Sequence, residues 1–310
     1  MRHIRVISPP DRTDAVLALL RSRPGVTHIT LALGASLVPA GDVLSAEVTR
    51  EAAHRVLQGL EELDIPADGA VTVSTLDTVL SDAADAAEKA VPGDPSDAVV
   101  WEELTARTRE ESTLNSTFVA FLVLAVLLAA VGVVTNSPVT VVGAMVVGPE
   151  FGPLAAIAVA LATRRFHFAV RPMIALSVGF PVAMLCTWLG AEAALAADLF
   201  TVDVLDSAGQ VDFIYRVGPF SLIVALLAGA AGMISMVTAK SAALVGVFIS
   251  VTTVPAAGYA VVAATVGEWQ RALESTGQLA INLAGIVVAG VLVLVLRPAA
   301  WRDMREQVGL

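Results

Sequence analysis

The chain has 310 residues, of which 56% are hydrophobic and only 15% are charged, and its mean hydropathy is +0.77. Soluble domains carry about 25% charged residues, so the composition indicates a membrane protein and excludes disordered, fibrous and nucleic-acid-binding classes. The single cysteine, Cys186, excludes a disulfide framework and a cysteine-rich metal site. Four scattered histidines leave little material for a metal cluster, so we expect no metal and no cofactor.

Charge divides the chain into two parts. Residues 1–112 hold 10 basic and 19 acidic residues, a net charge of −9, whereas residues 113–310 hold 9 and 10, a net charge of −1. An acidic first part argues against binding to nucleic acid or to anionic headgroups. The stretch Met1–Val6 lacks an apolar core of signal-peptide length. We therefore expect the first part to stay in the cytoplasm.

Residues 1–80 alternate between strand and helix periodicity. The pattern predicts the order β-α-β-β-α-β, which is that of a ferredoxin-like α+β sandwich. Domains of this kind often sense small ligands or pair edge to edge, which is an analogy only. The expected strands are 3–8, 26–33, 43–49 and 69–76, and the expected helices are 11–22 and 50–63.

Residues 81–112 are expected to connect this domain to the membrane part. Residues 81–97 are rich in Asp and Ala and end in Pro92-Gly93-Asp94-Pro95, which is typical of a linker. Residues 97–112 have the pattern of a charged amphipathic helix, which we expect to lie at the membrane entrance. At the other end of the chain, residues 299–310 are expected to form a cytoplasmic tail.

Residues 113–298 are predicted to form a transmembrane helical domain. A membrane-spanning helix needs about 20 apolar residues, and backbone polar groups in hydrocarbon must be satisfied internally, which favours helices. Four or five spans with one re-entrant segment are the alternative to six. The six candidate spans are 117–135, 138–163, 172–196, 219–239, 241–266 and 279–296.

Basic residues near the span ends predict the orientation, because they favour the cytoplasmic side. With the N-terminus inside, nine basic residues lie on the inner side and two on the outer side. This asymmetry predicts a multi-pass protein of the cell (inner or plasma) membrane with both termini cytoplasmic. The inner set is Arg107, Arg109, Arg164, Arg165, Arg171, Lys240, Arg297, Arg302 and Arg305, and the outer set is Arg216 and Arg271.

The second span is expected to be a broken helix. Asn136 and Ser137 suit a helix cap, and Pro138 suits the first turn, where its missing N–H has no intrahelical partner. The sequence then meets two prolines and two glycines within residues 148–153, which break or sharply kink a helix. The break comes about 12 residues into the span, or roughly 18 Å, close to the bilayer midplane. The breaking residues are Gly148, Pro149, Gly152 and Pro153.

Glu150 lies inside this break and is the only ionisable residue deep in an apolar span. An unpaired carboxylate at such a depth costs about 2.5–3.5 kcal/mol on insertion scales. The hypothesis for function is a proton or cation site lined by Glu150 and by backbone groups at Gly148 and Gly152. The alternative is a neutral carboxyl that caps the broken helix, or one that lies nearer the surface.

The fifth span carries a similar signal. Ser250, Thr252 and Thr253 precede Pro255, which is expected to break this span. Their hydroxyls can bond to carbonyls freed by the proline, or they can form a coordinating wall opposite Glu150. Paired interrupted segments point to a midplane binding site in transporters, and on this topology the pair would be inverted. In the last span, Asn282 can hydrogen-bond between helices.

The residues from Asn136 to Pro149, Asn-Ser-Pro-Val-Thr-Val-Val-Gly-Ala-Met-Val-Val-Gly-Pro, followed by Gly152-Pro153, resemble the signature of the bacterial hydrophobic family known as domain of unknown function 389. The similarity extends over residues 113–296. It includes Leu227-Ala-Gly-Ala-Ala-Gly232, Val254-Pro255-Ala256 and Asn282-Leu283. The resemblance implies a multi-pass membrane protein, often preceded by a small α/β domain. The family pattern has an apolar residue where this chain has Glu150.

Two hypotheses for function follow. The first is a transporter or channel-like protein for a small solute or ion, homo-oligomeric and regulated by its cytoplasmic domain. The second is a membrane-anchored sensory or scaffolding oligomer without transport. The expected partners are the lipid bilayer, further copies of the chain and a small ligand or ion, and not nucleic acid. No metalloprotease, nucleophile-elbow or phosphate-loop motif occurs in the sequence, so we do not expect an enzyme.

Overall fold

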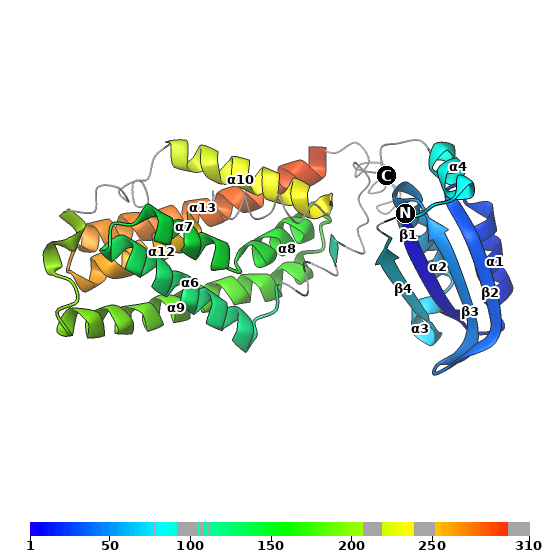
Figure 1. Ribbon diagram of the computed structural model, residues 1–310, viewed down its shortest axis with the longest axis horizontal. Helices are drawn as coiled ribbons and strands as arrows, with labels where there is room; N and C mark the ends of the chain where they lie inside the picture. Colours follow the sequence, from blue (N-terminus) through cyan, green and yellow to red (C-terminus); the bar gives the residue numbers. More distant parts are fainter. Residues whose placement is uncertain are drawn as a thin grey trace. The chain divides into compact units, whose positions relative to one another are not determined.

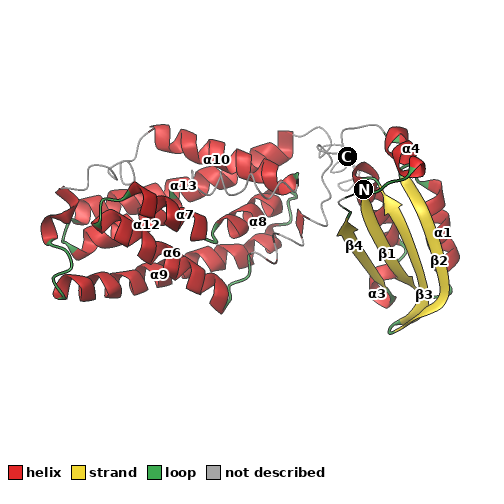
Figure 2. Cartoon of the chain, in the orientation of Figure 1, coloured by secondary structure: helices red, strands yellow, loops and turns green. Residues whose placement is uncertain are grey.

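The computed structural model describes residues 1–76, 78–91, 104–105, 108, 110, 112–206, 219–238 and 252–296. Contacts divide the chain into two compact units, which we call the N-terminal unit (Met1–Leu104) and the helical unit (Thr105–Leu310). Figure 1 labels the elements of both, and Figure 2 separates their helices from their strands.

The N-terminal unit is an antiparallel four-stranded sheet with helices packed on it. The strands have the order β2-β3-β1-β4. The predicted alternation of strands and helices is present, and two further helices, α3 and α4, extend it. The elements are β1 (Arg2–Ser8), α1 (Thr13–Ser22), β2 (Val26–Leu37), β3 (Ala40–Val48), α2 (Arg50–Glu62), α3 (Ile65–Asp68), β4 (Ala70–Thr75) and α4 (Asp82–Ala90).

Aliphatic side chains form the core of this unit. Alternate residues of β1 and β3, such as Ile4, Val6 and Leu44, are fully buried, because successive strand residues point to opposite faces. They pack against the apolar stripes of α1 and α2, which include Leu20 and Leu60. The sheet thus has one face buried beneath helices.

Two stretches differ from the expectation. The hairpin of β2 and β3 is longer than predicted, because its strands continue to the pair Leu37 and Ala40. Residues 82–90, expected within a linker, form α4 instead. The Ser81 hydroxyl accepts from the N–H of Ala83 and caps this helix. Asp82 in the first turn and Lys89 in the last turn also favour it.

The described part of the helical unit consists of helices. Four of them are long and apolar enough to cross a membrane, and a fifth candidate is a helix pair bent by 54°. The elements are α6 (Ser116–Val134), α7 (Pro138–Val147), α8 (Phe151–Ala162), η1 (Phe166–Ala169), α9 (Val170–Ala196), η2 (Val202–Asp206), α10 (Pro219–Val237), α12 (Thr253–Thr265) and α13 (Trp269–Leu296).

These helices relate to the six expected spans as follows. The spans 117–135, 172–196 and 219–239 correspond to α6, α9 and α10, and the span 138–163 is the bent pair of α7 and α8. Of the span 241–266, the structure describes residues 252–266, which are the short α12 and one residue on either side of it. The last helix begins at Trp269, ten residues before its expected start, because its first turns are polar and hydropathy alone does not mark them as helical.

Short and long helices occupy different places in the bundle. Every residue of α12 from Thr253 to Ala263 is buried, and the helix contacts α6, α7, α9 and α13 (Figure 1). The long helices instead expose apolar side chains, such as Leu124 on α6 and Leu189 on α9. A helix that is apolar all round belongs in the interior, whereas exposed apolar stripes on long helices suit lipid. This distribution is compatible with a membrane-embedded protein.

Small residues allow the helices to approach closely. At Gly229 of α10, an added Cβ would lie 2.7 Å from the backbone of Ile286 on α13, and at Gly285 it would lie 3.1 Å from the Cβ of Ala225. These small residues therefore bring α10 and α13 close together. Glycine suits them because close approach of backbones drives helix association in membranes.

Candidate functional site

A two-residue turn leads into the broken helix. Asn136 has a left-handed backbone with φ of 47°, and the Ser137 N–H donates to the carbonyl of Gly132 at 2.8 Å, which closes α6. Ser137 then caps α7, because its Oγ accepts from the Thr140 N–H at 3.3 Å, and Pro138 occupies the first turn. The two residues predicted as a cap thus lie at the joint between α6 and α7.

The break itself spans Gly148, Pro149 and Glu150, between the end of α7 and the start of α8. Pro149 has no N–H, so the carbonyl of Met145 lacks its ordinary i+4 donor. Gly152 and Pro153 lie inside the first turn of α8. Pro153 therefore follows the break at the start of α8, where a proline needs no intrahelical donor.

Glu150 is buried at this break. It is the N-cap residue of α8, and its side chain is 4% exposed. Its Oε1 accepts a hydrogen bond of 2.5 Å from Thr253 Oγ1, in the first turn of α12. Its Oε2 is buried and has no hydrogen-bond partner among the described residues. Two helix starts that lie 103 residues apart therefore meet at one carboxyl group.

The carboxyl of Glu150 folds back over the backbone of Gly148. A Cβ added at Gly148 would lie 2.3 Å from Glu150 Oε2 and 2.8 Å from Cγ2 of Val254. No larger residue fits there without displacing the carboxyl. Glycine is thus required at position 148 because the Glu150 side chain fills the space that a Cβ would need. Its role there is to leave room and not to make the backbone flexible.

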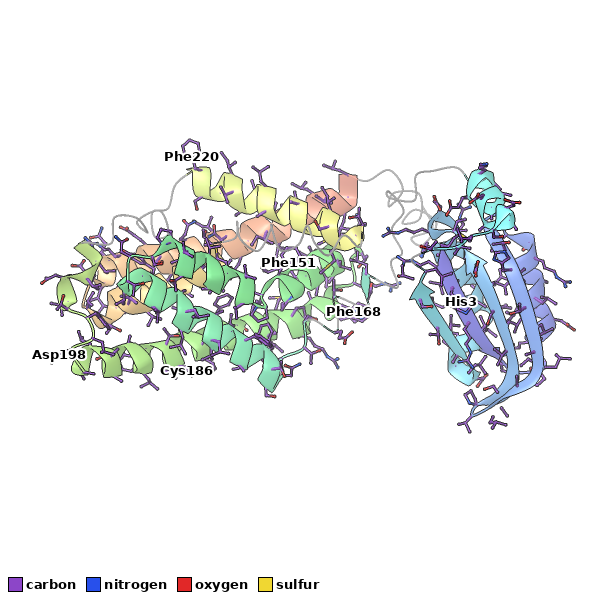
Figure 3. The ribbon with its side chains drawn as sticks, viewed as in Figure 1. His3, Phe151, Phe168, Cys186, Asp198 and Phe220 are labelled. Carbon is purple, nitrogen blue, oxygen red and sulfur yellow. The ribbon has the colours of Figure 1, made fainter. Side chains whose placement is uncertain are left out.

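Figure 3 contrasts the two sides of the bundle near this site. Phe151, the residue after Glu150, lies among the helices and is 4% exposed. Phe220, at the start of α10, projects outward and is 80% exposed. The Glu150 carboxyl therefore belongs to the interior of the helical unit.

A chain of buried polar side chains continues from this pair along α13. Asn282 Nδ2 donates to Thr252 Oγ1 at 2.7 Å, and Gln278 Nε2 donates to Asn282 Oδ1 at 3.0 Å. Gln278 Nε2 also donates to Ser221 Oγ on α10. Gln278 and Asn282 are each 1% exposed. Because Thr252 adjoins Thr253, the chain links α10, α13 and α12 to the Glu150 carboxyl. We call Glu150, Thr252, Thr253, Gln278 and Asn282 the polar cluster.

The residues predicted to line the site from the fifth span differ in where the structure places them. The structure brings Thr253 onto Glu150 and places Thr252 on Asn282, so the expected interhelical bond of Asn282 is present. Pro255 lies within the first turn of α12, so the described chain does not break at it. Ser250, with the whole stretch 239–251, lies outside the described residues.

Sequence reasoning missed Gln278 and Ser275. Both are buried, and Ser275 Oγ donates to the carbonyl of Ala256 on α12 at 2.8 Å. Together with Asn282 they lie at helical spacing on one face of α13. That spacing indicates a polar face on a helix. The expected last span begins at residue 279, so it excludes Ser275 and Gln278 from the predicted helix.

Charge at the polar cluster is not balanced by a basic side chain in the described part of the chain. The ion pairs found there join Arg12 to Asp68, His28 to Glu47 and Arg271 to Glu268, and none includes Glu150. No group of three or more His, Cys, Asp or Glu side chains that could hold a metal occurs among the described residues. The cluster thus offers one carboxyl and several neutral oxygen atoms.

A second polar group lies in the N-terminal unit. His28 has a left-handed backbone with φ of 49°, at an irregularity of β2. Its Nδ1 lies 2.5 Å from Glu47 Oε2, and its Nε2 lies 2.8 Å from Ser81 Oγ. His28 therefore connects the sheet to the cap of α4, the last described helix before the connector.

The polar cluster and the break after Val147 lie within a stretch that matches a protein family. Residues 145–288 match the family described as Domain of unknown function (DUF389). The chain resembles the DUF389 family. The resemblance predicted from the sequence is confirmed, and the matched stretch contains Glu150, Thr253 and Asn282. The description of DUF389 carries no activity. Neither a curated protein nor a solved structure matches the chain.

Proposed function

We propose that this DUF389-like chain is a transporter or channel-like protein that lets a small solute or ion cross the membrane at the broken helices. The observation that carries the proposal is the buried Glu150 carboxyl. One of its oxygen atoms is held by Thr253, and the other is without a partner in the described chain. Intramembrane carboxyls without a basic partner are costly and are typically functional.

The chemistry of the polar cluster favours a proton or a monovalent cation. It contains a single carboxyl, threonine hydroxyls and side-chain amide oxygens, all of them hard oxygen ligands. Divalent cations in proteins commonly take several carboxylates. The Pro149 break also frees the carbonyl of Met145, and carbonyls at interrupted helices coordinate Na⁺ or protons in transporters. Gly148, Gly152, Thr252, Thr253 and Ser250 remain the proposed lining beside Glu150.

The wider proposal concerns topology and assembly. Six spans in the cell membrane with both termini cytoplasmic are supported by the distribution of basic residues and by the apolar helices. A homo-oligomer is supported by the exposed apolar faces of the long helices. A ferredoxin-like N-terminal unit is supported by the strand order β2-β3-β1-β4. We propose that this unit regulates the helical unit and that the chain is not an enzyme.

His28 is the residue through which we propose that the N-terminal unit regulates the helical unit. It ties the sheet to the cap of α4 through Ser81, and α4 is followed by the connector to the helical unit. A ligand or partner that shifts β2 would therefore move His28, and with it the start of α4, which precedes the residues that lead to the helical unit. The proposed regulator is a small ligand or an ion.

The test is flux into proteoliposomes that hold the purified full chain. Proton, Na⁺ and K⁺ entry are followed with trapped dyes for the chain itself, for Glu150→Gln and for Thr253→Val. Glu192→Gln on α9 is the matched control, because it neutralises a carboxyl outside the polar cluster. We expect Glu150→Gln to abolish the flux and Thr253→Val to reduce it, with Glu192→Gln unchanged. Unchanged ion entry in Glu150→Gln, with the protein still monodisperse, contradicts the assignment.

A sensory or scaffolding oligomer without transport is the second candidate. The observation that favours it is the packing around Glu150, which is 4% exposed and fits closely over Gly148. A neutral carboxyl in this position would serve as a hydrogen-bonded strut between α8 and α12. If the chain is such an oligomer, Glu150→Gln should leave its fold unchanged. Neither the chain itself nor any variant should then show ion flux.

A further inference from the structure

The hairpin of β2 and β3 extends beyond the body of the sheet. β3 pairs with β1 only as far as Asp42, which lies opposite Ser8. β2 and β3 continue to pair past that point, at Ser36 with Gly41 and at Leu37 with Ala40. Residues 33–41 therefore form a two-stranded projection, which we call the hairpin tip.

The hairpin tip is apolar and exposed. Leu33, Leu37 and Val38 are 75%, 87% and 90% exposed. Residues 29–41 contain no charged side chain, although residues 1–112 carry a net charge of −9. Large aliphatic side chains grouped at a projecting end mark an interaction site when they are exposed together.

Hydrogen bonds hold the hairpin tip in this shape. Asp42 Oδ2 accepts from Thr13 Oγ1 at 2.7 Å, and its Oδ1 accepts from the Gly34 N–H at 2.7 Å. Ser36 Oγ donates to the carbonyl of Pro39 at 2.7 Å. The base of the projection is thus tied to α1, and its aliphatic side chains are presented to the surroundings instead of folding onto the sheet.

We propose that the hairpin tip inserts into the interfacial layer of the lipid bilayer that holds the chain's own apolar helices. The stretch between Val91 and Ser116 can extend at most about 90 Å, so it tethers the N-terminal unit within reach of that bilayer. The interfacial layer of a bilayer is fluid, so uncharged aliphatic side chains can insert into it in any arrangement. A protein partner, in contrast, needs a surface of matching shape. The acidic remainder of the unit is repelled by anionic headgroups, so the uncharged tip is the part suited to contact lipid.

This inference requires only that the helical unit lies in a bilayer, and it is independent of ion permeation. The test uses nitroxide labels in vesicles of zwitterionic phosphatidylcholine that hold the full chain. Cys186 is the one cysteine, so Cys186→Ala gives a background for single labels. The test label is placed at Val38→Cys. The matched control is Leu80→Cys, which is 94% exposed in the same unit and near Asp82 and Asp85.

A third label, at Leu189→Cys on the exposed face of α9, reports lipid directly. Collision with oxygen, which concentrates in lipid, is compared with collision with a water-soluble nickel chelate. We expect the ratio of oxygen to nickel collisions at residue 38 to be severalfold higher than at residue 80 and close to that at residue 189. Adding Leu37→Asp should lower the ratio at residue 38 to that at residue 80.

Three results overturn the proposal. Equal ratios at residues 38 and 80 mean that the tip stays in water. Low collision with both oxygen and the nickel chelate at residue 38, together with dipolar broadening between two labels there, means that a second copy covers the tip. A water-like ratio at residue 189 means that α9 does not face lipid, and the premise fails. Unchanged ion entry in the Glu150→Gln experiment would contradict the proposed function and would change none of these readings, so the two proposals fail separately.

Discussion

The two units differ in where their polar and apolar side chains lie. The core of the N-terminal unit is built from aliphatic residues such as Ile4, Leu44 and Leu60, and most of its charged residues are not buried. The helical unit exposes aliphatic side chains on its long helices and buries the polar cluster at the centre. Water drives the first arrangement. The exposed apolar side chains of the second suit lipid, and in lipid helix contacts depend on close packing and hydrogen bonds.

The contrast changes what a buried polar group means. In the N-terminal unit, Asp42 and Thr13 satisfy each other at the base of the hairpin. In the helical unit, Glu150 keeps one buried oxygen without a partner in the described chain. A buried polar group that lowers the stability of the fold and has no compensating hydrogen bond is a candidate for function. The following predictions test this contrast.

The largest effect is expected in the apolar core. Leu44→Ala should destabilise the N-terminal unit by about 2–5 kcal/mol, because it leaves a cavity among fully buried neighbours. Hydrogen exchange of β1 and β3 amides in the detergent-solubilised full chain measures this loss. Leu80→Ala is the control, and its effect should stay within about 0.5 kcal/mol, since Leu80 is exposed. Equal protection in both variants would contradict the assigned core.

The next effect is expected at the helix break. Gly148→Ala should cost about 1–3 kcal/mol through overpacking, since the new Cβ meets the Glu150 carboxyl and Val254. Unfolding in mixed micelles of detergent and lipid measures it. Gly143→Ala on α7 is the matched control, because no atom lies within 4 Å of its added Cβ. Since alanine favours helix more than glycine, Gly143→Ala should be neutral or stabilising. A similar loss in both variants would refute the packing argument.

A smaller effect is expected for the hydrogen bonds of the polar cluster. Asn282→Leu removes the bonds to Thr252 and from Gln278. Side-chain hydrogen bonds between membrane helices contribute about 0.6 kcal/mol on average and up to about 1.7. A double-mutant cycle with Thr252→Val in the same micelles should give a coupling energy in this range. Gln270→Ala, at an exposed position of α13, should change nothing. Zero coupling would mean that the bond does not hold the helices together.

The smallest effect is expected for pH. The hydroxyl of Thr13, and then the N–H of Gly34, hold the pKa of Asp42 below its ordinary value. A lowered pKa in the folded state gives stability that is present above the unfolded pKa of about 3.9 and is lost as pH falls through the folded pKa. Hydrogen exchange of β3 between pH 7 and pH 3 should show this loss. Thr13→Val should weaken the dependence, and an identical pH profile would exclude the contribution.

Much of the architecture was predictable from local patterns. Alternation of apolar residues located the four strands, and the Pro149 and Gly148 pair located the bend, because both signals lie within a few neighbouring residues. Thr253 was singled out as a candidate wall opposite Glu150, and the structure brings the two side chains into contact. Whether that contact serves permeation remains a proposal.

The rest depends on tertiary contacts that a sequence pattern does not encode. The polar first turns of α13 are helical because they pack on α12 and α10, so hydropathy placed the helix start ten residues too late. Gln278 went unnoticed for this reason. Pro153 and Pro255 looked like helix breakers, yet both lie in first turns, where the position in the helix decides the effect of a proline.

The length of α13 has a consequence for the polar cluster. Its 28 residues extend about 42 Å, against a hydrocarbon thickness of about 30 Å, so a helix of this length would lean in a bilayer or project from it. The lean of a long helix follows the thickness of the lipid around it. Asn282 on α13 donates to Thr252, next to the Thr253 that bonds Glu150, so on the proposed membrane topology a change of bilayer thickness would reach the Glu150 carboxyl through α13.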